Sequence, residues 1–246
     1  MPRGRPPAPG ETWSSAALAA TLEKIATTDG EAFYRGELAE KMVAHSQSAN
    51  GAHALADFAG HTCEWVTPLG LDYRGVTVHE IPPNGQGISA LMALGILSNF
   101  DLASQAVDSA AVQHLEIEAM KLAFADAYRY VSDPGTMSVP ASSLLDRGYL
   151  AMRAREIDPL RAQRMGPGQP PQGGTVYLCA ADQDGMMVSF IQSNYMGFGS
   201  GVVVPSTAIS LQNRGAGFTL AKGHPNEVAG GKRPYHTIIP GFVTRD

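Results

Sequence analysis

Hydrophobic residues recur every three or four positions in four stretches of the chain, which is the spacing of one buried face of an α-helix. The first stretch begins after Ser14 and Ser15, whose hydroxyls suit the start of a helix, and the second covers residues 31–46. The third begins after Gly87, and the fourth covers residues 109–131. The side chains predicted to face the core are Leu18, Leu22, Ile25, Phe33, Leu38, Met42, Ile88, Leu91, Met92, Ile96, Leu115, Ala119, Leu122 and Phe124.

Strand patterns are concentrated in the last third of the chain. The predicted strands are residues 75–81, 175–181, 186–193, 202–204 and 237–243. The second and third of these flank the turn Asp182-Gln183-Asp184-Gly185 and form a predicted hairpin. Residues 47–61, 133–174 and 212–218 are rich in small, polar or glycine residues and are predicted to be loops. Helices in the first part and strands in the last part predict a layered α/β fold.

The composition is that of a folded chain with little charge. Of the 246 residues, 44% are hydrophobic and 17% are charged, whereas disordered chains combine low hydrophobicity with high charge. The net charge of −5 offers no basic surface for nucleic acid, and no apolar run reaches the ~18 residues that span a membrane. The first residues lack the hydrophobic segment of a signal peptide, which predicts a cytoplasmic protein. Cys63 and Cys179 are too isolated to indicate a disulfide framework or a zinc site, and the sequence indicates no metal or cofactor.

The junction between Gly174 and Thr175 joins a glycine-ended loop to a threonine at the first position of a strand. A threonine hydroxyl is a weak nucleophile that needs an adjacent base. Cleavage of this bond would place a new α-amine, with a pKa of ~7.7–8.0, beside the hydroxyl whose proton it can accept. Gly173 and Gly174 leave the backbone free to bend so that the hydroxyl reaches the preceding carbonyl. A strand that merely begins with threonine has the same pattern.

Six segments in fixed order extend this observation to nearly the whole chain. They are PGETW with LAATLEKIA, GEAFYRGELAEKMV, YRGVTVHEIPPNGQG, HLEIEAMKLAFADAYRYVSDP, TVYLCAADQDGMMVSFIQSNYMGFGSGVVVP and GKRPYHTIIPGFV. Together, from Gly10 to Asp246, the sequence resembles the gamma-glutamyltransferase family of N-terminal nucleophile hydrolases. The resemblance implies a partial αββα sandwich and a precursor that cleaves itself before Thr175. Residues 1–174 then resemble the later part of a large subunit, and residues 175–246 resemble the early part of a small one.

The resemblance also assigns roles to residues near the junction. Thr175 corresponds to the catalytic nucleophile, and Ser193 corresponds to a hydroxyl residue that hydrogen-bonds it. Asn194 and Tyr195 fall where the family places a polar residue that contacts the α-carboxylate of the substrate. The implied substrate is a γ-glutamyl or related acyl amide, such as a glutathione-type compound.

The remaining substrate contacts differ from those of the family's transpeptidases. Arg214 and Gly217 stand where transpeptidases have an amide or acid and then an aspartate that hold the α-amine of the substrate. His236 and Thr237 replace two serines that follow the segment KRP (232–234). The segments SNYMGFGSG and QNRGAGF resemble a hydrolase-like branch better than the transpeptidases.

The chain also departs from the family in length. Family chains are much longer, and neither their upstream substrate-gripping arginine nor their downstream oxyanion-hole glycines has a counterpart before Asp246. The sequence therefore predicts an internal piece of such a protein. Three interpretations stay open: an enzyme acting through an acyl-Thr175 intermediate on γ-glutamyl amides, an acylase for another acyl group such as glutaryl, and an inactive truncated fragment.

One further pair has the spacing of metal ligands. His114 and Glu118 lie four positions apart on the predicted helix 109–131, so both face the same side of it. Two ligands on a helix need a third from elsewhere to hold a metal. Simple hydrogen bonds by both side chains are the favoured interpretation.

Overall fold

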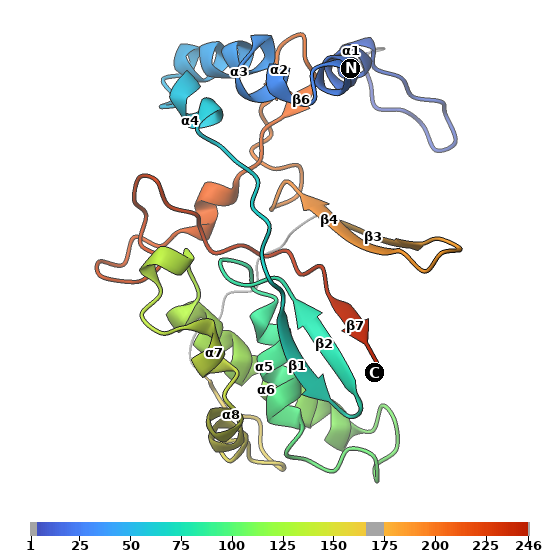
Figure 1. The fold of residues 1–246 in the computed structure, drawn as a ribbon, viewed down its shortest axis with the longest axis vertical. Coiled ribbons are helices and arrows are strands. Elements are labelled where there is room, and N and C mark those ends of the chain that lie inside the picture. The colour runs from blue at the N-terminus through green and yellow to red at the C-terminus, as the bar shows by residue number, and fades with distance from the viewer. Residues whose placement is uncertain (1–3, 166–174, 246) are drawn as a thin grey trace. The chain divides into compact units, whose positions relative to one another are not determined.

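The computed structural model describes residues 4–165 and 175–245 and divides into two compact units (Figure 1). Unit 1 consists of Met1–Trp65 and Phe198–Gln212, and unit 2 consists of Val66–Gly197 and Asn213–Asp246. None of the three boundaries between these segments coincides with the junction at 174 and 175. The division into subunit-like regions 1–174 and 175–246 concerns cleavage rather than packing, and it stays a prediction.

Unit 1 consists of helices and a short β-ribbon. Its elements are α1 (Ala16–Thr27), α2 (Glu31–Tyr34), α3 (Glu37–Ser48), α4 (Leu55–Ala59), β5 (Val203–Val204) and β6 (Ile209–Ser210). The Ser15 hydroxyl caps α1 by accepting a hydrogen bond from the Leu18 amide at 3.2 Å. Leu38 and Met42 of α3 are almost fully buried, as the sequence predicts.

Two details predicted for unit 1 are wrong. The single helix expected over residues 31–46 is broken into α2 and α3 at Gly36, where a Cβ atom would lie 3.0 Å from the Cα of Ala32. Leu22 is 56% exposed although its spacing predicts burial. The buried residue of α1 is instead Thr21, whose hydroxyl donates to the carbonyl of Thr207 at 2.7 Å.

Unit 2 is built on a three-stranded antiparallel sheet with the order β1-β2-β7 (Figure 1). The sheet strands are β1 (Leu69–Tyr73), β2 (Val76–Glu80) and β7 (Phe242–Thr244), and the helices are α5 (Ile88–Leu97), α6 (Ala110–Tyr130), α7 (Ala141–Leu144) and α8 (Arg147–Ala154). Helix α5 contacts β1 and β2, and both α6 and α8 contact α5. The predicted apolar faces of the two long helices form the core, with Ile88, Leu91, Met92, Ile96, Leu115, Ala119 and Leu122 all buried.

Short elements occur where the sequence predicts loops. Helix α4 lies within 47–61, and α7, α8 and a 3₁₀ turn (Pro134–Thr136) lie within 133–165. Side-chain caps explain two of these helices. The Asp57 carboxylate accepts from the amide before α4 at 2.8 Å, and the Asp146 carboxylate accepts from the Tyr149 amide in α8 at 2.8 Å. The rest of the predicted loop, 166–174, lies outside the described residues.

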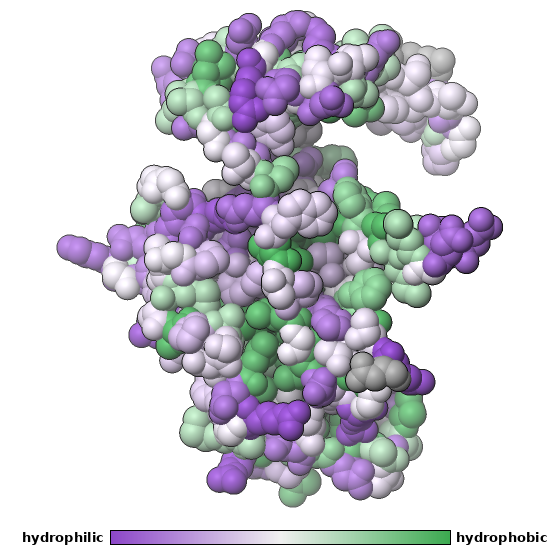
Figure 2. All heavy atoms as spheres, in the orientation of Figure 1, coloured by the Kyte–Doolittle hydropathy of each residue, from purple (hydrophilic) through white to green (hydrophobic). Residues whose placement is uncertain are grey.

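The predicted hairpin is confirmed as β3 (Thr175–Ala181) and β4 (Met187–Ser193), whose backbone register places Thr175 opposite Ser193. The carboxylate of Asp182 stabilises the turn by accepting from two amides at 2.9 and 3.0 Å. Figure 2 shows hydrophobic residues along this hairpin and hydrophilic ones at its tip. The Ser189 hydroxyl donates to the carbonyl of Gly241 at 2.9 Å, which ties the hairpin to the chain entering β7.

One predicted strand is shorter than expected, and one observed strand has no counterpart in the prediction. The strand expected over 237–243 pairs with β2 only through Phe242–Thr244, because Pro240 has no amide hydrogen to donate to a ladder. Strand β1 was not predicted by the pattern, and it pairs with β2 from Leu69 to Tyr73.

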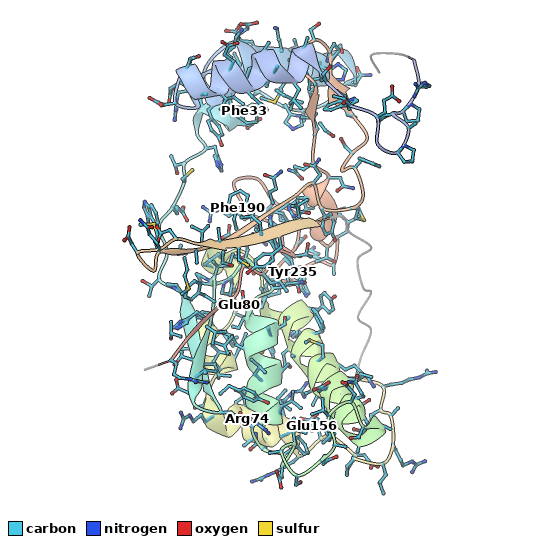
Figure 3. All side chains as sticks on the ribbon, turned by 90° about the vertical axis from the view of Figure 1, so that its right-hand side faces the viewer. Phe33, Arg74, Glu80, Glu156, Phe190 and Tyr235 are labelled. Atoms are coloured by element: carbon cyan, nitrogen blue, oxygen red, sulfur yellow. The ribbon has the colours of Figure 1, made fainter. Side chains whose placement is uncertain are left out.

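Glu80 is the last residue of β2, and its side chain is buried. It lies at the N-terminal end of α5 (Figure 3). A Cβ atom on Gly87 would lie 2.4 Å from Oε2 of Glu80, and one on Gly241 would lie 3.0 Å from Oε1. Both glycines therefore leave the space that the carboxyl fills. Among the described residues, Oε2 has no hydrogen-bond partner. Burial disfavours the charged form and raises the pKa of Glu80 from 4.5 to about 7.

Glu80→Gln should therefore change stability in a pH-dependent way. Between pH 4.5 and about 7 the folded protein binds more protons than the unfolded chain, so its free energy of unfolding falls as the pH rises. Glutamine has no proton to lose in this range, so the free energy of unfolding of the variant does not fall in this way. At pH 8 the variant should be more stable than the original protein by on the order of 1–3 kcal/mol, with little difference at pH 4.

Denaturant unfolding at the two pH values measures this difference. The matched control is Glu116→Gln, which removes an exposed carboxyl from α6 and should leave the free energy of unfolding nearly unchanged. An equal effect of Glu80→Gln at pH 4 and pH 8 would contradict the ionisation assigned to Glu80.

Candidate active site

The turn that follows β4 has an unusual backbone. Tyr195 is 9% exposed and has a φ of +80°, a left-handed conformation that bulky residues seldom adopt. The Tyr195 amide donates to the hydroxyl of Ser193 at 2.9 Å. Such conformations are maintained by surrounding contacts and are concentrated at functional sites. The roles of Ser193, Asn194 and Tyr195 stay predictions, and the strained turn makes this segment a candidate functional site.

Asn213 fixes this turn from a distant part of the sequence. Its amide donates to the carbonyl of Asn194 at 3.2 Å, and its side-chain oxygen accepts from the Met196 amide at 3.1 Å. A 3₁₀ turn, Arg214–Gly217, begins directly after it. Arg214 is thereby placed next to the turn that carries Tyr195.

Arg214 is buried, with only 7% of its surface exposed. Its guanidinium carbon lies 5.2 Å from the ring centroid of Tyr195, and Nη1 donates to the hydroxyl of Thr237 at 3.2 Å. Burial lowers the pKa of Arg214, while Tyr195 opposes that shift. Arginine nevertheless stays protonated at neutral pH, so the site holds a buried positive charge.

His236 is the neighbour of Thr237 and is neutral. Burial and the charge of Arg214 lower the pKa of His236 to about 4. The Ile238 amide donates to Nδ1 of the ring at 3.4 Å, which assigns the proton of the neutral imidazole to Nε2. His236 is therefore a neutral donor beside a cation, and both groups suit an anionic ligand.

The structure brings together most of the residues that the sequence selects. Arg214 contacts both Tyr195 and Thr237, and His236 precedes Thr237 in the chain and lies close enough for the charge of Arg214 to lower its pKa. Thr175 is placed by its main chain, which pairs with that of Ser193 at the start of the same turn. The catalytic and substrate-binding roles of these residues stay predictions.

Gly217 lies so close to the backbone of Tyr235 that no side chain fits at position 217. A Cβ atom there would lie 2.6 Å from the carbonyl oxygen of Tyr235. An aspartate at 217, as the resemblance implies for transpeptidases, would require the backbone to move. The site therefore combines a buried arginine with a closed position where an acid would have to stand.

Several residues at the site were not selected from the sequence. Asn84 and Gln86 hold the segment that contains His236, and Asn226 holds Tyr235 by accepting from its amide at 3.0 Å. All of these contacts join residues far apart in the chain or across a loop. The segment PPNGQG, which interrupts the pattern between a strand and a helix, is the one sequence signal that points to Asn84 and Gln86.

His114 and Glu118 each form hydrogen bonds with other residues, which is the interpretation that the sequence favours. His114 bonds the carbonyl of Asp158 through Nε2 at 2.8 Å. Glu118 is 1% exposed and accepts from Lys121 at 2.6 Å and from the Gln163 amide at 3.3 Å. Within the described part of the chain, no three potential ligands are grouped to hold a metal ion.

The described helices include none long and apolar enough to cross a membrane.

Comparison with solved structures defines the class. The chain is similar to a cephalosporin acylase from Bacillus halodurans, with a TM-score of 0.92 and 51% sequence identity over 100% of this chain and 44% of that one. This similarity confirms the predicted fold class, a partial αββα sandwich of the N-terminal nucleophile hydrolase type.

The family follows from the sequence match. The chain belongs to the gamma-glutamyltranspeptidase family, whose model matches residues 1–246. It is 39% identical to the glutathione hydrolase-like YwrD proenzyme of Bacillus subtilis, over 99% of this chain and 46% of that protein. It is 38% identical to the oxamate amidohydrolase proenzyme of Klebsiella pneumoniae, over 96% of this chain and 44% of that protein. The chain thus spans about half the length of the curated relatives it matches.

Proposed function

We propose that this chain supplies the nucleophile and the acyl-binding residues of a self-cleaving amidase of the gamma-glutamyltranspeptidase family. Its substrates are γ-glutamyl amides of the glutathione type and related acyl amides. The observation that carries this proposal is the contact of Arg214 with Tyr195 and Thr237, beside the strand that begins with Thr175. Relatives of two activities, a glutathione hydrolase-like protein and an acylase, support an amide as the substrate.

Cleavage before Thr175 creates the catalytic group. The hydroxyl of Thr175 attacks the carbonyl carbon of the amide while the new α-amine accepts its proton. The carbon–nitrogen bond then breaks, the amine leaves with that proton, and the acyl group is held as an ester on Thr175. Water, or an acceptor amine, attacks the ester and restores the free hydroxyl.

The residues around Arg214 select the acyl group. The guanidinium forms paired hydrogen bonds with carboxylates, and the neutral His236 and the hydroxyl of Thr237 add polar groups beside it. A γ-glutamyl group also carries an ammonium, which is costly to bury without an acid. Residues 212–225 contain no acid, and Gly217 has no room for one. Acyl groups with a terminal carboxylate and no amine, such as glutaryl, therefore fit at least as well as γ-glutamyl.

The products of cleavage and the compartment are also part of the proposal. Residues 1–174 and 175–246 belong to a large and a small subunit of one precursor, which stay associated as partners. Cys63 and Cys179 are both free and exposed, which agrees with a reducing compartment such as the cytoplasm.

Self-cleavage gives the first prediction of this proposal. In the protein as its gene encodes it, intact mass and N-terminal sequencing should reveal a subunit that begins Thr-Val-Tyr. Thr175→Ala should abolish both cleavage and turnover, because it removes the attacking hydroxyl, whereas Thr175→Ser should retain part of each. Thr244→Ala, which removes an exposed strand threonine, is the matched control and should cleave normally. Full activity of an uncleaved protein would contradict the assignment of Thr175.

Substrate selection gives the second prediction. The kcat/KM for a glutaryl anilide should equal or exceed that for the γ-glutamyl anilide. Arg214→Met should lower the glutaryl value about 10- to 100-fold, because charge-assisted hydrogen bonds are worth ~1.5–3 kcal/mol. It should leave a butyryl anilide, which has no carboxylate, nearly unchanged.

Arg129→Met, at an exposed position of α6, is the control for charge and should change neither value. A γ-glutamyl preference above ~100-fold, equivalent to about 2.7 kcal/mol, would mean that another acid binds the amine. In that case the role of Arg214 in selection would be wrong.

A further inference from the structure

Gln86 lies in the segment PPNGQG (82–87), between β2 and α5, and binds three successive residues of the chain that carries His236. Its amide nitrogen donates to the carbonyl of His236 at 2.8 Å. Its side-chain nitrogen donates to the carbonyl of Thr237 at 3.3 Å, and its side-chain oxygen accepts from the hydroxyl of Tyr235 at 3.0 Å. One residue thus fixes the segment 235–237.

The neighbours of Gln86 reinforce this attachment. The His236 amide donates to the carbonyl of Asn84 at 3.0 Å, and the Asn84 side chain donates to the carbonyl of Pro234 at 2.6 Å. Figure 3 shows Tyr235 at the end of α5 where that helix begins. Tyr235 is 7% exposed, and burial raises its pKa, so its hydroxyl stays protonated and continues to donate to Gln86.

Thr237 links this attachment to the candidate active site. Its carbonyl accepts from Gln86, and its hydroxyl accepts from Nη1 of Arg214. The guanidinium also lies over the ring of Tyr195. A shift of Thr237 would therefore disturb a hydrogen bond that orients the guanidinium.

We infer that Gln86 is a positioning residue for substrate selection: it aligns Thr237, and through Thr237 it orients Arg214 toward the carboxylate end of the acyl group. This inference rests on the proposed function. The amide side chain suits the task because it donates and accepts at once, to Thr237 and from Tyr235, whereas a carboxylate could only accept. Gln86 does not have to touch the substrate to have this effect.

Gln86→Met tests the inference, because methionine has nearly the same volume and no hydrogen-bonding amide. The KM for the glutaryl anilide should rise about 5- to 10-fold, as expected for the loss of two hydrogen bonds near the site, with kcat nearly unchanged. The kcat/KM for the butyryl anilide should stay within about twofold. Tyr235→Phe removes one of the two side-chain bonds and should raise the KM for glutaryl by a smaller factor.

A double-mutant cycle with Thr237→Val separates positioning from general packing. If Gln86 acts through the hydroxyl of Thr237, the two substitutions together should raise the glutaryl KM no more than Thr237→Val alone. Asn99→Ala is the structural control, because it removes an amide that bonds the carbonyls of Gly95 and Ile96 at the end of α5. It should affect both substrates alike.

Three results would overturn the inference: equal loss on both anilides in Gln86→Met, no loss on either, or additive effects with Thr237→Val. If Gln86→Met does not fold, Tyr235→Phe provides the test. No loss on either anilide in that variant, or additive effects with Thr237→Val, would likewise overturn the inference. If the protein without substitutions showed no preference in kcat/KM for the glutaryl over the butyryl anilide, the proposed function and this inference would both be contradicted. Intact selectivity in the variants would contradict only the role of Gln86.

Discussion

The burial of one positive charge constrains the rest of the candidate site. Arg214 loses most of its water, and the interactions that offset this loss include those with the ring of Tyr195 and the hydroxyl of Thr237. A desolvated cation–π contact is worth ~2 kcal/mol. The left-handed backbone of a residue such as Tyr195 costs about 1–3 kcal/mol, so the two effects nearly cancel. The arrangement therefore depends on the hydrogen bonds of Asn213 and Gln86, which hold the turn and the opposite segment.

The same constraint limits what the site can accept. A buried guanidinium beside a neutral His236 attracts a carboxylate, and it repels the ammonium that a γ-glutamyl group carries. Gly217 adds a steric limit, since the nearby carbonyl of Tyr235 excludes any side chain. Under the proposed function, charge and shape thus favour the same acyl groups.

The sequence predicted the features that depend on long local patterns. The core faces of α5 and α6 and the hairpin β3–β4 were correct, because ten or more residues of α5 and α6, or two facing strands, give a clear period. Helices α4, α7 and α8 were missed because each has eight residues or fewer, which is too short for a periodic face.

The contacts that build the site could not be read from local patterns. Gln86 and Tyr235 are separated by 149 positions, and only the fold brings them together. The burial of Glu80 was hidden for a similar reason, since the space for its carboxyl is supplied by Gly87 and the distant Gly241. The resemblance selected Tyr195, Arg214, His236 and Thr237 as one group, but it could not say what orients them.

A structure of the cleaved protein with bound glutarate, the product of the glutaryl substrate, tests the central claim most directly. One carboxylate of glutarate should lie near Thr175, and the other should accept hydrogen bonds from the guanidinium of Arg214, with Thr237 and the ring of Tyr195 in their present contacts. The account would be contradicted if the distal carboxylate were bound by other residues while Arg214 kept its contacts and left the ligand untouched.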